Sequence, residues 1–139
     1  MKKYLYLFIL FTLIFGCSTQ KKLKKIPKEE LTILRTSFDG NGCKNEITIF
    51  SNSDNFNQYQ KSFIIPGKKN SPLDIVDFSD KKIAVICKMD ISNYDASELI
   101  VNKKKGILKL TKSNTEFDDS INTLFLEIPK EIHYLILEY

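Results

Sequence analysis

Apolar and polar residues alternate with a period of two along most of the chain after residue 30, a spacing typical of β-strands with one buried face. Six short segments show this pattern: 31–36, 46–50, 97–101, 107–111, 122–128 and 133–139. Residues 82–88 contain an unbroken apolar run instead, which is typical of a strand buried on both faces. The pattern therefore predicts a sheet of about five to seven strands, with 82–88 as its central strand.

One segment has the spacing of a helix. Phe56, Tyr59 and Phe63 recur at intervals of three and four residues, which places them on one helix face. Ser53 is placed to cap the N-terminus of this helix, and the Pro-Gly pair at 66–67 to end it. A helix packed on a mainly antiparallel sheet is an α+β fold, so we expect a single α+β domain with one or two helices on the sheet.

A hairpin is predicted between the segments 97–101 and 107–111. The loop between them, residues 102–106, holds three lysines and ends in Gly106. Because glycine adopts a left-handed backbone conformation without steric cost, Gly106 is expected to take that position of the turn.

The last two strand segments each have a defined apolar face. Leu124, Leu126 and Ile128 alternate along one strand, and Leu135 and Leu137 along the next. Residues two apart on a strand point to the same side, so each set is expected to face a core.

The N-terminus has the layout of an export signal. Lys2 and Lys3 precede an apolar segment at 4–15, and Gly16 is followed by Cys17. This order resembles the bacterial lipoprotein signal, although Phe15 is bulkier than the small residue usual at that position. The apolar segment is shorter than the ~20 residues that span a membrane, which argues against a transmembrane anchor. The resemblance implies that residues 1–16 are removed and that Cys17 is acylated.

The net charge of +4 is unevenly distributed. Residues 17–30 hold five lysines against two glutamates, whereas residues 31–139 hold 14 basic and 15 acidic side chains. We therefore expect a basic tether at 17–30 that lies near lipid headgroups, followed by a nearly neutral domain at 31–139. A neutral domain gives no indication of nucleic-acid binding.

Two cysteines remain once Cys17 is assigned to the lipid. An even number of cysteines in an oxidising compartment favours a disulfide between Cys43 and Cys87. The alternative is a buried, reduced thiol at Cys87, since that residue ends an apolar run and cysteine packs as a small hydrophobic residue.

A family resemblance rests on residues 75–86, Ile-Val-Asp-Phe-Ser-Asp-Lys-Lys-Ile-Ala-Val-Ile. This segment resembles the V-D-F-S-x-x-x-V-L-A-V stretch of the PrcB-like lipoprotein domain, the protease complex subunit family of bacterial envelopes, and the resemblance covers roughly residues 46–139. The glycine-rich turn that usually follows is absent from residues 87–94, where only Tyr94 matches. The resemblance implies a non-catalytic, lipid-anchored subunit that binds and stabilises an envelope complex such as a protease.

Catalytic and metal-binding patterns are weak. His133 is the single histidine and lies in an apolar β segment, where a histidine is more often structural than a general base. The cysteines and the histidine lack the short spacing of a zinc site. We therefore expect no enzyme activity, no metal and no cofactor, and no small-molecule substrate is indicated.

These observations favour a lipoprotein that binds a partner protein. Exposed tyrosine and phenylalanine beside a neutral domain favour protein contacts, so residues 55–63 and 89–94 form the candidate surface, with Tyr59, Met89 and Tyr94 as contact residues. The alternative is that the aromatic residues of 55–63, Tyr59 among them, belong to the core as the apolar face of an amphipathic helix. The alternative is an inhibitor or immunity-like lipoprotein acting on an envelope enzyme, and a small hydrolase is a remote third reading. The expected location is the bacterial cell envelope, anchored by lipid to the outer membrane with the domain facing the periplasm.

Overall fold

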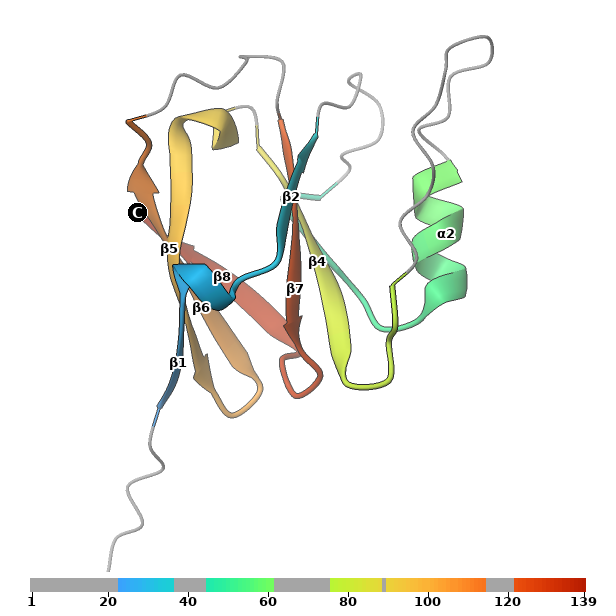
Figure 1. Cartoon of the computed structure of the whole chain (residues 1–139). Helices are drawn as coiled ribbons and strands as arrows, with labels where there is room; N and C mark the ends of the chain where they lie inside the picture. Colours follow the sequence, from blue (N-terminus) through green and yellow to red (C-terminus); the bar gives the residue numbers. More distant parts are fainter. Residues whose placement is uncertain (1–22, 37–44, 62–75, 89, 115–121) are drawn as a thin grey trace, which may run out of the picture.

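The computed structural model describes residues 23–36, 45–61, 76–88, 90–114 and 122–139 (Figure 1). Its elements, in chain order, are β1 (Lys24–Pro27), the 3-10 helix η1 (Lys28–Glu30), β2 (Ile33–Thr36), β3 (Ile47–Phe50), α2 (Ser53–Lys61), β4 (Lys81–Cys87), the 3-10 helix η2 (Ile91–Asn93), β5 (Tyr94–Asn102), β6 (Lys105–Lys112), β7 (Thr123–Pro129) and β8 (Tyr134–Glu138).

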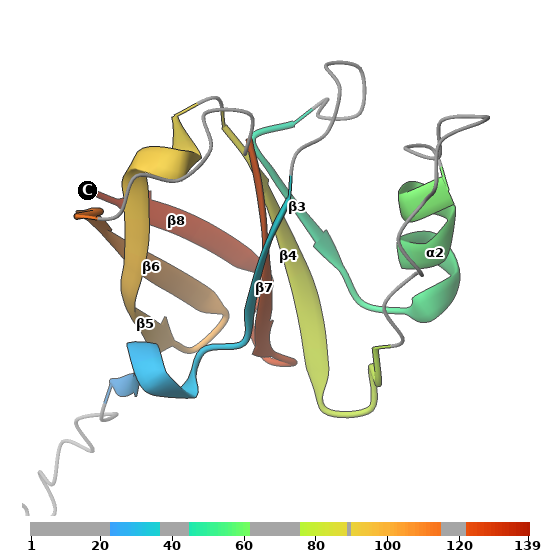
Figure 2. The same cartoon turned by 45° about the horizontal axis from the view of Figure 1, so that its top comes forward.

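The strands form two four-stranded sheets, which we call sheet A (β1-β5-β6-β8) and sheet B (β2-β7-β4-β3). The two sheets face each other, and α2 lies on the outer side of sheet B (Figures 1 and 2). All strand pairs are antiparallel except β6 and β8, which run parallel. The predicted α+β domain with a mainly antiparallel sheet is confirmed, but the strands divide between two sheets rather than one. Alternation shows which face of a strand is buried, but not which strand lies beside it.

The main core lies between the sheets. β7 contributes Leu124, Leu126 and Ile128, all at most 1% exposed, and β8 contributes Leu135 with the partly buried Leu137. The apolar faces predicted for these two strands are therefore confirmed. β7 belongs to sheet B and β8 to sheet A, so the connection between them carries the chain from one sheet to the other.

β4 is an interior strand of sheet B, with β7 on one side and β3 on the other. Its residues Ile83–Ile86 are each at most 3% exposed. Ala84 and Ile86 face the core between the sheets, while Ile83 and Val85 belong to a second apolar cluster beneath α2. This two-sided burial explains the unbroken apolar run and confirms its prediction.

α2 begins with a side-chain cap from Asn52. The Asn52 Oδ1 accepts a hydrogen bond of 2.9 Å from the backbone N–H of Asn55, which satisfies a donor that the first turn leaves unpaired. The prediction that Ser53 is the cap is therefore wrong by one residue, because Ser53 is already the first residue of the helix. Phe63 and the Pro-Gly pair lie outside the described residues.

Phe56 holds α2 on sheet B. Its side chain is 2% exposed, and its ring lies 5.6 Å from that of Phe50 and 5.9 Å from those of Phe78 and Phe125, measured between centroids. Tilted and edge-on ring pairs at this separation are favourable arrangements. The second cluster is therefore mainly aromatic.

The domain begins earlier than expected. Lys24–Pro27, expected to belong to the basic tether, form β1, which pairs with β5 from Lys24↔Val101 to Pro27↔Glu98. Only Ile26 of this strand packs against the core. Residues before 31 thus already belong to the sheet, because one inward apolar residue among lysines gives too weak a pattern to reveal a strand.

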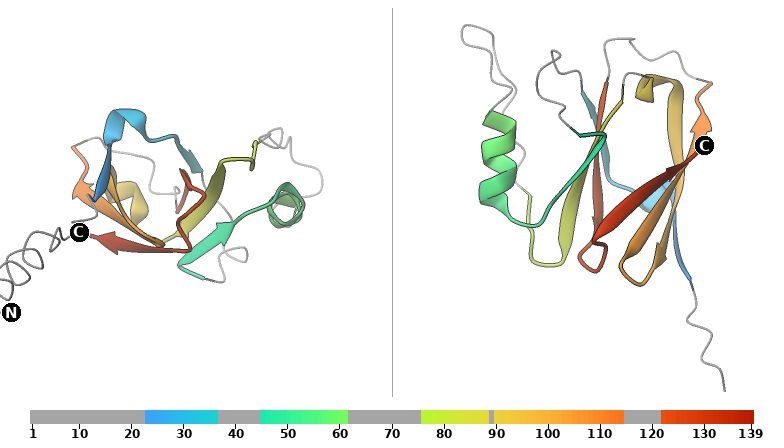
Figure 3. Two further views of the ribbon diagram at one scale, coloured as in Figure 1. Left: turned by 90° about the horizontal axis from the view of Figure 1, so that it is seen from below. Right: turned by 180° about the vertical axis from the view of Figure 1, so that it is seen from behind.

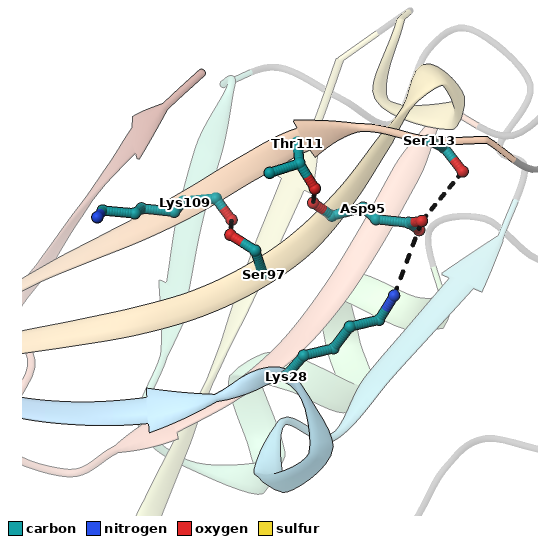
Figure 4. Close-up of polar contacts among 6 residues, drawn as sticks. All are labelled: Lys28, Asp95, Ser97, Lys109, Thr111 and Ser113. Carbon is teal, nitrogen blue, oxygen red and sulfur yellow. Dashed lines mark hydrogen bonds and ion pairs between the residues drawn. The ribbon is translucent and has the colours of Figure 1, made fainter.

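Polar contacts fix the segment after β1 to sheet A (Figure 4). Lys28 Nζ lies 3.8 Å from the Asp95 Oδ2 of β5, and the Ser113 hydroxyl donates a 3.0 Å hydrogen bond to the same oxygen. Lys25 forms a second ion pair with Glu98 at 4.0 Å. These lysines are part of the folded domain rather than of a free tether.

A β-bulge in β5 resets which of its residues face the core. The register shifts between Ala96 and Glu98, which leaves Ser97 as the extra residue. The Ser97 hydroxyl donates to the Lys109 carbonyl at 3.2 Å (Figure 4). Because of this insertion, Ala96 and Leu99, three residues apart, both face the core.

The hairpin between β5 and β6 does not use Gly106 in its turn. Lys103, with φ of 55°, takes the left-handed conformation instead. Gly106 lies within β6, where a Cβ atom would come 2.8 Å from Leu135 Cδ1. The prediction for Gly106 is therefore wrong: the glycine serves close packing against β8.

Within the described ranges, no helix has the length and apolar character needed to cross a membrane.

Candidate functional site

An apolar cleft opens between α2 and the β2 edge of sheet B. It has a volume of 360 Å³, and we call it the α2–β2 cleft. It is lined by Thr32, Ile33, Leu34, Phe56, Val76, Ile83, Phe125 and Glu127. Its walls come from three elements of sheet B, from α2 and from the residues before β4, so the packing of the whole layer determines its shape (Figure 1).

The strand register explains why the cleft is apolar. Leu34 pairs with Phe125, and Phe125 pairs with Val85, so these three side chains form a row on the helix-facing side of sheet B. Phe56 covers the inner part of this row, where Phe125 is only 7% exposed. Leu34 lies beyond the reach of α2 and is 48% exposed. The helix therefore covers the centre of the sheet and leaves its β2 side open.

The cleft adjoins an edge strand. In the part of the chain that the structure describes, β2 pairs only with β7 and lies at the end of sheet B. An edge strand presents backbone N–H and C=O groups to whatever lies beside it. The α2–β2 cleft thus combines an apolar surface with a backbone edge that another extended segment can join.

A charged pair marks the polar side of the cleft. Lys81 Nζ donates to Glu127 Oε2 at 2.9 Å, and Glu127 lines the cleft. This hydrogen bond raises the pKa of Lys81 above its ordinary value of 10.5, because it stabilises the charged form of the lysine. A ligand at this end of the cleft would meet a carboxylate already engaged by a lysine.

Tyr59, a predicted contact residue, is half-buried beside the cluster under α2. Its ring centroid lies 4.8 Å from that of Phe50, and its hydroxyl lies 3.7 Å from Cys87 Sγ. Burial raises the pKa of Tyr59 above 10.0.

Tyr94, the second such residue, packs against the core between the sheets, and its ring meets that of Tyr139 edge-on at 5.0 Å. The two tyrosines thus join apolar clusters on opposite faces of sheet B, and the structure does not bring them together. Met89 lies outside the described residues.

The cysteine prediction is answered in part. Cys87 is disulfide-bonded, which removes the alternative of a reduced thiol. Cys43 and Cys17 lie outside the described residues, so the pairing of Cys87 with Cys43 stays a prediction, as does the acylation of Cys17.

The described residues contain no group of three or more His, Cys, Asp or Glu side chains that could hold a metal ion. The His133 side chain is exposed, while its backbone N–H donates to the Lys104 carbonyl at 2.7 Å.

The sequence contained one signal for the cleft. Ile33 and Leu34 are adjacent in a strand, so their side chains point to opposite faces and one of them must leave the core between the sheets. Ile33 packs against that core, and Leu34 faces the cleft. The position of α2, which decides how much of the outer face stays open, is set by tertiary packing.

No family model, curated protein or solved structure matches the chain. The resemblance of residues 46–139 to the PrcB-like domain therefore stays a prediction.

Proposed function

We propose that the chain is a non-catalytic binding protein of the bacterial envelope, and that its α2–β2 cleft holds an extended segment of a partner protein. The observation that carries this proposal is the apolar cleft beside the edge strand β2.

Such a segment would add a strand next to β2. Its backbone would bond to the edge of β2 that no described strand occupies, and alternate side chains would enter the cleft, the usual mode of recognition at an exposed sheet edge. The volume of 360 Å³ lies near the lower end of the range for ligand pockets, about 300–1,000 Å³. A short run of apolar side chains suits this size better than a folded surface does.

The proposal includes the membrane anchor. Acylation of Cys17 would hold the domain close to a membrane, with residues 17–23 as the link to β1. The outer membrane, with the domain facing the periplasm, is the location we propose. The PrcB-like resemblance supports a protease complex as the partner.

The cleft is tested by a pair of matched variants. Leu34→Asp and Ile136→Asp each place a carboxylate at an exposed apolar strand residue, since Leu34 is 48% and Ile136 42% exposed. The tagged full chain is used to capture partners from detergent-solubilised envelopes. We expect the wild type and Ile136→Asp to retain one stoichiometric protein that Leu34→Asp loses.

Hydrogen exchange on the purified complex then locates the contact. Slower exchange of the β2 amides at 33–36 is expected, since the added strand would bond to the side of β2 opposite β7. Retention of the partner by Leu34→Asp with unchanged β2 exchange would refute the cleft. If the isolated chain abolishes the activity of a captured enzyme, the inhibitor or immunity-like role is favoured over a scaffold.

The anchor is tested separately. Labelling with radioactive palmitate should reach the wild type and Cys43→Ala but not Cys17→Ala, because Cys17 is the cysteine that directly follows the signal segment. Equal labelling of all three proteins would exclude lipidation at Cys17.

A further inference from the structure

A second cleft lies at the end of the molecule where β1 begins. The β5–β6 turn and the β7–β8 connection meet there beside the start of β1 (Figures 1 and 3). The cleft has a volume of 650 Å³ and is lined by Lys24, Val101, Asn102, Lys103, Lys104, Glu131 and His133. We call this site the basic cleft, because it gathers three lysines against one glutamate.

The three lysines differ from their neighbours in having no acidic partner in the described structure. Lys25 and Lys28 form ion pairs with Glu98 and Asp95, and Lys109 forms one with Glu98 at 3.0 Å. No described carboxylate forms an ion pair with Lys24, Lys103 or Lys104, and all three residues are exposed. The nearby Lys82 donates instead to the Ile132 carbonyl at 2.7 Å.

The backbone around the basic cleft is fixed. The N–H groups of His133 and Tyr134 donate to the Lys104 carbonyl at 2.7 and 3.3 Å, which joins the β5–β6 turn to the β7–β8 connection. β1 pairs with β5 at Lys24↔Val101. Two segments, the start of β1 and the β5–β6 turn, thus place lysines around one opening, and the β7–β8 connection adds Glu131 and His133. Ammonium groups at such a site suit a phosphate anion, which lysine binds as a point charge.

The short distance along the chain between Cys17 and the basic cleft indicates which phosphate compound the cleft binds. Lys24 is the seventh residue after Cys17, and seven extended residues reach at most about 25 Å. If Cys17 is acylated, as proposed above, the basic cleft cannot lie far from the lipid headgroups. We propose that the basic cleft binds the phosphate group of an anionic membrane phospholipid. The domain then docks with this end on the membrane and leaves α2 and β2, the elements that border the α2–β2 cleft, on its flank (Figure 1).

The test measures the reactivity of Lys24 in the full chain bound to vesicles. Vesicles of phosphatidylcholine alone are compared with vesicles that also contain phosphatidylglycerol, and acylation of Lys24 by an amine reagent is followed by mass spectrometry. We expect labelling of Lys24 to slow on the order of fivefold on the anionic vesicles.

Two double variants carry equal changes in charge. K103E/K104E alters the basic cleft, whereas K61E/K112E alters exposed lysines outside it. The slowing should persist in K61E/K112E and disappear in K103E/K104E. Circular dichroism verifies that both variants fold. Equal slowing in both variants, or equal slowing on the two kinds of vesicle, would overturn the proposal.

Two further measurements distinguish lipid phosphate from free phosphate and test whether the effect requires the anchor. Inorganic phosphate without vesicles should leave Lys24 labelling unchanged, and slowing by phosphate alone would overturn the lipid assignment. The comparison is repeated with Cys17→Ser protein added to preformed vesicles. Slowing that survives in Cys17→Ser supports the basic cleft even if palmitate labelling rules out the anchor, so the two proposals can fail independently.

Discussion

Gly106 lies where β6 passes β8, and its missing Cβ allows the strands to pack this closely. A Cβ atom there would lie 2.8 Å from Leu135 Cδ1 and 3.1 Å from Ile132 Cδ1, both in buried side chains. In a strand without such neighbours, replacing glycine by alanine stabilises a protein by about 0.4–1 kcal/mol, because it restricts the unfolded chain. At this position overpacking should outweigh that gain.

We predict that Gly106→Ala lowers the free energy of unfolding by about 1–3 kcal/mol, measured by urea denaturation. Leu135→Val removes the colliding carbon, so the double variant should lose less stability than the two single variants together. Strictly additive losses would show that this contact does not decide the effect.

Single residues also show what the sequence could predict. The inward faces of β7 and β8 followed from alternation alone, because burial repeats every second residue. The role of Gly106 did not, because it depends on a residue 29 positions away. The contact residue Leu34 was missed for a similar reason: its exposure depends on where α2 ends its cover of sheet B.

At the scale of elements, α2 depends on support from outside itself. It has nine residues, fewer than the ~12–15 at which isolated helices become even marginally stable in water. Phe56 supplies the packing and Asn52 the cap. The helical segment was predictable from the spacing of its aromatic residues. Asn52 and Ser53 are both residue types that cap helices, so only the backbone geometry shows that Asn52 is the cap.

Asn52→Ala should therefore destabilise the protein by about 1 kcal/mol, the usual cost of losing a cap. Ser53→Ala is the matched control and should have little effect, because Ser53 is the first residue within the helix. Chemical denaturation with far-UV circular dichroism measures both. A larger loss in Ser53→Ala than in Asn52→Ala would contradict the observed cap.

For strands too, the sequence pattern predicts burial better than it predicts pairing. The long apolar run of β4 identified a strand buried on both faces. β1 was not predicted, because Ile26 is its single residue packed on the core and its neighbours include lysines. The parallel pairing of β8 with β6 could not be predicted either, since two strands close in sequence usually pair with each other. Here β7 and β8 belong to different sheets.

At the scale of the whole molecule, the disulfide of Cys87 links sheet B to a cysteine outside the described residues. If the partner is Cys43, the bridge closes a loop of about forty residues and contributes about 3–4 kcal/mol in the chain-entropy account. Such a contribution is large against the 5–15 kcal/mol that typically separates folded from unfolded domains.

We predict that Cys43→Ser lowers the unfolding free energy by about 3–4 kcal/mol and makes it insensitive to reducing agent. Cys17→Ser is the control and should behave as the wild type does, with a loss of stability only on reduction. The reverse outcome, in which Cys17→Ser removes the bridge, would assign the partner of Cys87 to Cys17. Mass spectrometry of non-reduced peptides identifies the linked pair directly.

β1 also determines how the domain carries mechanical load. If the N-terminus is anchored and a partner is bound, as proposed, tension between them passes through Lys24–Pro27, which pair with β5 over four registers. The hydrogen bonds of an antiparallel pair run across the strands, so a pull along β1 loads them in shear and all at once rather than one after another. The ion pairs of Lys25 and Lys28 with sheet A hold the same segment near its start and just past its end. A short edge strand would thus be the mechanical link between the proposed anchor and the rest of the domain.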